Sequence, residues 1–166
     1  MDKQQRITIS ILSVILLVII VVTARILITR ESKTILGEFQ APPFDDRAVS
    51  GAPVVDDSLN YREVTVAEGF KFSMCGNLTL NDNGCLVYFT SPSDNKVWLL
   101  VKMYDVDGNL LGQSNLLRPG EYIENIELSE KPDTNIPVKL KILSYEPNTY
   151  YSQGSAEASF VLKVKE

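Results

Sequence analysis

The sequence predicts an all-β fold, an immunoglobulin-like antiparallel β-sandwich of seven to nine strands, preceded by one N-terminal transmembrane helix and an extended linker. Three observations lead to this prediction. An uninterrupted apolar run covers Ile7–Ala24. Residues 30–60 then combine prolines with paired acidic residues. From Tyr61 to Glu166, short β-rich runs alternate with turn residues about every 8–12 positions, a spacing typical of sandwiches and barrels.

The apolar run is long enough to cross a membrane. Ile7–Ala24 carries no charge, and the apolar character resumes after Arg25 through Ile28. At about 1.5 Å per residue, a helix over Ile7–Ile28 spans roughly 33 Å, against a hydrocarbon core of about 30 Å. Residues 7–29 are therefore predicted to form a transmembrane signal-anchor helix.

The orientation follows from the layout of the chain, because basic residues flank both ends of the run and the charge asymmetry is weak. Residues 1–6 are a short head, and all soluble residues lie behind the run. This layout predicts a cytoplasmic head and a single-pass protein of the cell membrane with its C-terminal domain outside the cell. Two alternatives remain open: a domain that faces the cytoplasm, and cleavage of a signal peptide after Val22–Ala24, which loosely fits the small-residue rule.

Residues 30–60 are predicted to be an acidic, Pro-containing linker. The segment shows little periodicity, and its like charges repel one another, so an extended stalk is expected. Phe39 and Phe44 are the two residues of this segment that could instead dock on the domain or on a partner. The residues that define the linker are Pro42, Pro43, Pro53, Asp45, Asp46, Asp56 and Asp57.

Residues 61–166 are predicted to be the extracellular β-sandwich domain. Val138, Leu140 and Ile142 alternate with lysines, as expected for a strand with one buried face. The segment Lys96–Tyr104 is apolar on both faces and is predicted to be the most buried strand. The turns at Asn81–Gly84 and Asp107–Asn109 have the residues that tight hairpins require. The expected strands are Tyr61–Ala67, Phe70–Cys75, Leu78–Leu80, Cys85–Thr90, Lys96–Tyr104, Leu110–Ser114, Tyr122–Leu128, Pro137–Tyr145 and Ala156–Lys165.

The two cysteines, Cys75 and Cys85, leave two alternatives open. If Leu80 and Cys85 flank the hairpin turn, the register places Cys75 opposite Thr90. A Cys75–Cys85 disulfide then requires the chain to leave the ladder, for which Gly76 is a suitable break. Such a bridge would close a short loop and contribute about 3 kcal/mol in the chain-entropy model. The alternative is two independent buried thiols.

Composition excludes several function classes. From residue 31 onward there are 12 basic and 20 acidic residues, which argues against nucleic-acid binding. The chain has no histidine, the commonest general base and metal ligand. Asp105, Asp107 and Asn109 have the alternating spacing of a calcium loop, but the glutamate at its twelfth position is missing and a turn is the simpler interpretation. No enzyme activity, cofactor or metal site is predicted.

The candidate binding residues are Tyr150 and Tyr151. They lie in the loop between the last two expected strands, and loops at the end of a sandwich commonly carry binding residues. Aromatic rings stack on the apolar faces of sugars, so wall glycan is the ligand that this pair suggests. Trp98 lies inside an apolar strand and is interpreted as a core residue.

The order of landmarks resembles that of small extracellular β-sandwich proteins of Gram-positive bacteria, which are single-pass or lipid-anchored. Those landmarks are Ser91–Asn95, Tyr104–Asn109, Arg118–Glu121 and Ile126–Leu128, and the resemblance covers about half of the chain. It implies a fold and a location but no activity. No functional residue is carried over from it.

Together these observations predict a membrane-anchored extracellular module for binding or assembly. It is non-catalytic, has a protein partner at the cell surface, and serves as an accessory subunit of a bacterial cell-envelope complex. The alternative is a carbohydrate-binding domain of the cell wall that uses Tyr150 and Tyr151.

Overall fold

The structure is a computed structural model that describes residues 41–164. The predicted head and signal-anchor helix lie outside the described residues. Within 41–164, no helix has the length and apolar character needed to span a bilayer. Residues from Ala41 onward form one compact unit, which is described here by itself.

The described unit is all-β, as predicted, apart from one short 3-10 helix, η1 (Asp57–Leu59). It has ten strands rather than the seven to nine expected. The strands are β1 (Val49–Ser50), β2 (Tyr61–Thr65), β3 (Lys71–Cys75), β4 (Leu78–Asn81), β5 (Gly84–Thr90), β6 (Trp98–Tyr104), β7 (Leu110–Gln113), β8 (Glu121–Ile126), β9 (Ile136–Tyr145) and β10 (Ser152–Lys163).

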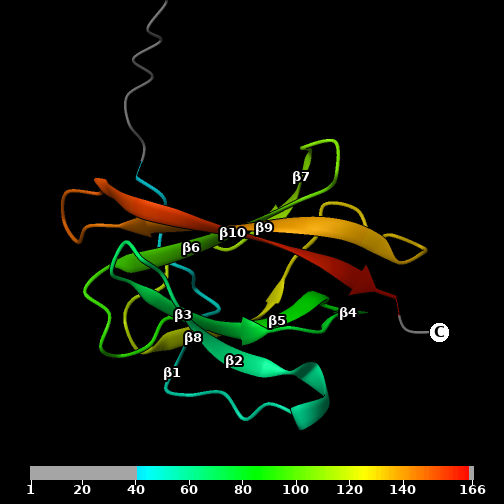
Figure 1. The fold of residues 1–166 in the computed structure, drawn as a ribbon, viewed down its shortest axis with the longest axis horizontal. Coiled ribbons are helices and arrows are strands. Elements are labelled where there is room, and N and C mark those ends of the chain that lie inside the picture. Colours follow the sequence, from blue (N-terminus) through cyan, green and yellow to red (C-terminus); the bar gives the residue numbers. More distant parts are fainter. Residues whose placement is uncertain (1–40, 165–166) are drawn as a thin grey trace, which may run out of the picture. The chain divides into compact units, whose positions relative to one another are not determined.

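The strands form one curled sheet with the order β1-β8-β5-β4-β10-β9-β6-β7, and β3 joins β2 to β5. The curl places β6, β9 and β10 over β2, β3, β5 and β8, so the unit has two layers (Figure 1). Short β4 connects the layers, because it pairs antiparallel with β5 and parallel with β10. The parallel pair departs from the purely antiparallel arrangement that was predicted.

The core lies between the two layers. Alternate residues of β9 are buried and the lysines between them face outward, as the alternation predicts. Strand β6 contributes four buried residues and is paired on both sides, so it is a buried strand as predicted, but it is not the most buried one, because five of the seven residues of β5 are buried. The largest fully buried side chains are Phe70, Phe89, Leu78, Leu99, Met103, Leu116, Leu117, Ile123, Ile126, Leu140, Ile142 and Leu162.

The layers also meet beside β7, where Gly112 bridges Leu128, just after β8. A Cβ atom on Gly112 would collide with the backbone carbonyl oxygen of Glu127. Glycine is required at this position because the two backbones approach too closely for any side chain.

The boundary of the domain differs from the prediction. Residues 41–60 were expected to belong to the linker, but in the structure they are part of the folded unit that begins at Ala41. Strand β1 pairs with the start of β8, and Phe44 forms a parallel bridge with Leu116. The prolines and acidic pairs look like linker composition, yet the few apolar residues among them are enough to attach the segment to the sheet.

The register around the cysteines also differs from the prediction. Leu80 pairs with Cys85 as expected, but Thr90 pairs with Ser73 instead of Cys75. The offset of two residues arises because Gly76 leaves the ladder between β3 and β4, and because β5 is irregular between Leu86 and Phe89. The expected break at Gly76 is therefore present.

Candidate functional site

We refer to residues 41–50 as the N-terminal strap, because they follow the outside of the sheet before β2 begins. The backbone N–H of Leu116 donates to the carbonyl of Pro43 at 2.9 Å, and the N–H of Asp45 donates to the carbonyl of Leu116 at 2.9 Å. The strap ends in β1, which pairs with Tyr122 and Glu121 of β8. The strap is thus held by backbone bonds at both ends.

The centre of the strap is fixed by a buried ion pair. The side chain of Asp45 is fully buried and accepts hydrogen bonds from Arg47 Nε and Nη2, both at 2.9 Å. It also accepts from the backbone N–H of Asn115 at 2.9 Å and from that of Arg47 at 3.1 Å. Arg47 then reaches Glu127 with its third guanidinium nitrogen, at 3.0 Å.

These contacts decide the charge state of the carboxyl group. Burial alone would raise the pKa of Asp45, but the hydrogen bonds from Arg47 and Asn115, together with the positive charge of Arg47, lower that pKa below its usual value. Asp45 is therefore ionised at neutral pH. Its role is structural, since all of its bonds hold the strap in place.

An aromatic cluster lies at the end of the unit where the strap begins. The ring of Trp98 makes edge-on contacts with Phe44, at 4.8 Å between centroids, and with Tyr150, at 5.1 Å. The guanidinium of Arg118 lies over the ring of Phe44, 3.6 Å from its centroid. Trp98 is half-buried rather than a core residue, because its ring faces this cluster at the start of β6.

The two predicted binding tyrosines have different surroundings. Tyr150 is half-buried with its ring against Trp98, and its backbone adopts a positive φ of 59°. Tyr151 is 71% exposed. Of the two rings, therefore, only that of Tyr151 is freely accessible, whereas the ring of Tyr150 packs against Trp98.

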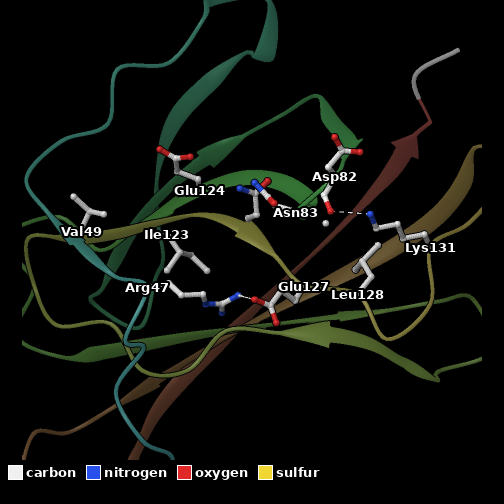
Figure 2. A pocket seen from close by; sticks show the side chains of 11 residues that line it. Arg47, Val49, Asp82, Asn83, Ile123, Glu124, Glu127, Leu128 and Lys131 are labelled. Atoms are coloured by element: carbon white, nitrogen blue, oxygen red, sulfur yellow. Dashed lines mark hydrogen bonds and ion pairs between the residues drawn. The ribbon is translucent and has the colours of Figure 1, made fainter.

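An open depression of about 630 Å³ lies along the outer edge of β8 (Figure 2). Strand β1 covers only the first two residues of β8, so the depression begins where β1 ends. Its lining residues are Arg47, Val49, Asp82, Asn83, Gly84, Ile123, Glu124, Asn125, Glu127, Leu128 and Lys131.

The two basic residues that line this depression, Arg47 and Lys131, already have partners. Arg47 points toward Glu127, and Lys131 donates to the backbone carbonyl of Asp82 at 2.7 Å (Figure 2). Glu124 points away from these pairs. The depression is shallow and of mixed charge.

Both cysteines carry free thiols and are completely buried in the core. Burial raises the pKa of Cys75 to about 11, and burial together with the nearby Cys75 raises the pKa of Cys85 to about 12. Because the thiolate is the reactive form, neither thiol is suited to nucleophilic or redox chemistry at neutral pH.

In the acidic turn after β6, the carboxylate of Asp105 binds another residue of the same turn. Asp105 accepts from the backbone N–H and from the side-chain amide of Asn109, both at 2.8 Å, and these bonds lower its pKa. The residues that have the spacing of a calcium loop thus form a hydrogen-bonded turn. Across residues 41–164, no three His, Cys, Asp or Glu side chains gather as a metal site.

Comparison with known proteins adds no relative: no family model matches the chain, and no curated protein or solved structure matches it.

Sequence reasoning placed the tyrosine loop but missed its neighbours. Phe44 was assigned to the linker, with docking as an alternative, and Arg118 was interpreted only as part of a turn. A signal was present: Ala41 and Pro42 each precede a proline, which biases the chain that leads into Phe44 toward an extended backbone. The pairing of Phe44 with Arg118 depends on long-range packing, which no local pattern encodes.

Proposed function

We propose that this protein is a membrane-anchored extracellular module for assembly, an accessory subunit of a bacterial cell-envelope complex that binds a protein partner. The described unit would be a variant of the immunoglobulin-like sandwich, in which β4 joins the two layers. The apolar run Ile7–Ile28 would hold it to the membrane. Because the folded unit begins at Ala41, only residues 30–40 would serve as linker.

The observation that carries this proposal is the free edge of β10. Strand β10 pairs with β9 along its length, but within the described residues its other edge is paired only at Leu162 and Lys163, with β4. Backbone donors and acceptors on such an edge can add a strand from another protein, which is a recurrent mode of assembly.

The test is co-purification from the native host. Tagged full-length protein is crosslinked lightly, solubilised and purified, with a version that begins at Ala41 as the control. We expect one stoichiometric membrane partner with the full-length protein, and retention of that partner by the version that begins at Ala41, because this version still contains the β10 edge. If no partner protein co-purifies with the full-length protein, the proposal is contradicted.

A second candidate function is binding of wall glycan by the tyrosine loop. It is favoured by the exposure of Tyr151, which directly follows Tyr150, whose ring packs against Trp98. Tyr151→Ala should abolish retention of the protein on purified wall fragments, while its thermal unfolding stays unchanged. Equal retention of the variant and the wild type would exclude this candidate.

A further inference from the structure

The edges of the sheet are protected unequally. Strand β1 has two residues, and β2 presents Arg62 and Glu63 to solvent, which are the usual devices against unwanted pairing. Strand β7 is bridged to Leu128 through Gly112. Strand β10 is the exception, since the stretch Ser155–Val161 has a regular ladder on one side and no described strand on the other.

This free stretch is bounded at both ends. The bulge between Ser152 and Gly154 interrupts the ladder before it, and β4 occupies the same edge from Leu162 onward. The β2–β3 turn lies against Gly154, because a Cβ atom there would stand 2.8 Å from Cγ of Glu68. The stretch between these limits, Ser155–Val161, is seven residues long, which is the length of a single short strand.

The side chains beside the edge indicate what that segment looks like. Toward the core, Ala156, Ala158 and Phe160 are only half-buried, so apolar side chains from an added strand would complete the burial of this row. Because residues alternate between faces, the segment must carry these apolar residues at every second position.

The opposite face of the same strands is basic in an otherwise acidic unit. Residues 41–164 contain 10 basic and 17 acidic residues, yet Lys102 and Lys141 are direct cross-strand neighbours on β6 and β9. Lys139 and Lys141 share one acidic partner, Glu157, at 3.9 and 3.1 Å. This outer face therefore keeps excess positive charge beside the free edge.

The register refines the position of a complementary charge. Lys139 pairs with Ser159, whose side chain is small, so an acidic residue opposite Ser159 lies within reach of that lysine. A second acidic residue opposite Glu157 would be repelled, since like charges placed directly across a ladder destabilise it. Charge complementarity thus selects one position of the incoming strand.

We propose that the edge Ser155–Val161 of β10 binds an extended segment of a partner protein, antiparallel to β10, with apolar residues facing the half-buried row and an acidic residue opposite Ser159. This inference rests on the proposed function and specifies the site and the chemistry of the partner. Main-chain bonds would provide affinity, while the alternating side chains would provide specificity.

The test adds such a segment to the full-length protein. A flexible Gly/Ser linker of about ten residues after Glu166 carries the heptapeptide Thr-Val-Glu-Val-Thr-Val-Thr, which gives a local concentration in the millimolar range. In an antiparallel ladder that begins opposite Val161, its glutamate lies opposite Ser159. One control has lysine in place of the glutamate, and a second has proline in place of the three valines.

Hydrogen exchange of the purified protein in detergent is the readout. Because the tether gives a millimolar local concentration, we expect amides within 155–161 to exchange about tenfold more slowly in the glutamate fusion than in the unfused protein. The same amides should be less protected in the lysine fusion and unprotected in the proline fusion. Protection confined to β2, or no protection, would overturn the proposal. If the lysine and glutamate fusions are equally protected, the proposed acidic residue opposite Ser159 is wrong. If the unfused protein is a dimer in which residues 155–161 are protected, a second copy of the chain covers this edge.

A paired variant separates this inference from the proposed function. Ser159→Lys places a charge on the free edge, and Thr65→Lys places the same charge on the edge of β2. We expect the first to abolish co-purification of the partner and the second to leave it unchanged. If both variants retain a partner, the edge proposal fails and the assembly function stands. If no partner is recovered from the wild type while the glutamate fusion is protected, the assembly function fails and the edge remains a strand-binding site.

Discussion

Replacing Asp45 with asparagine tests whether the buried ion pair holds the strap. Four hydrogen bonds end on this carboxylate, two from the guanidinium of Arg47 and two from backbone N–H groups. Asparagine keeps the shape but removes the charge and turns one acceptor into a donor that faces other donors.

The expected magnitude follows from the burial of the two partners. Breaking a fully buried ion pair costs about 3–5 kcal/mol. The side chain of Arg47 is 35% exposed and keeps its contact with Glu127, so its charge is not stranded. The cost then reduces mainly to the hydrogen bonds and the unsatisfied N–H of Asn115, or about 2–3 kcal/mol of the free energy of unfolding.

Urea unfolding of residues 41–166 measures this cost. With a slope of about 1–3 kcal/mol per molar urea, the midpoint should fall by about 0.7–3 M. Asp46→Asn is the matched control, because Asp46 is exposed and adjacent. If both variants unfold at the same urea concentration, the reasoning about the buried pair is refuted.

Acid should remove the same contribution from the wild type. The pKa of Asp45 is lower in the folded state than in the unfolded state, so its stabilisation is fully present above the unfolded value of about 3.9 and is lost as the pH falls through the lower, folded value. The difference in stability between wild type and Asp45→Asn should therefore shrink below about pH 4. A difference that stays constant down to pH 2 would contradict the assignment.

Three further changes probe other parts of the unit. Gly112→Ala should lower the free energy of unfolding by about 1–3 kcal/mol, as measured in urea, because the new methyl group collides with a backbone carbonyl. Cys75 and Cys85 should resist alkylation by iodoacetamide at pH 8 in the folded protein and react after unfolding in urea, as followed by mass spectrometry, since both thiols are buried with raised pKa values. Tyr150→Ala should change the fluorescence of the chain's single tryptophan and cost about 1 kcal/mol, whereas Tyr151→Ala should do neither.

Each of these outcomes has a matched comparison. Gly108→Ala adds a methyl group in open space, so it should cost only the strain of its positive φ. Native-state alkylation of either cysteine would show that the core opens readily. A mass two units below that of the reduced chain before any reagent is added would instead reveal the Cys75–Cys85 disulfide that the sequence left open.

The strand segments were predictable because they depend on local alternation. Val138, Leu140 and Ile142 lie on the buried face, as their spacing requires, and Leu80 pairs with Cys85 because the turn between them fixes the register. The attachment of the strap was not predictable in this way. It depends on Phe44 and Asp45 finding partners some 70 residues further along the chain, and their neighbours have the composition of a linker.

The edge of β8 and the edge of β10 differ in how far the described residues cover them. The strap pairs with the first residues of β8, its Arg47 joins Glu127, and Gly112 closes the far end beside Leu128. The chain thus uses its own residues at both ends of the β8 edge and leaves only a short opening, which is the depression of Figure 2. Beside Ser155–Val161 of β10 no described residues do the same, although that stretch is longer and carries one acidic side chain. Since long unprotected edges pair with other chains unless they are blocked, this edge is the place where a partner strand would complete the fold.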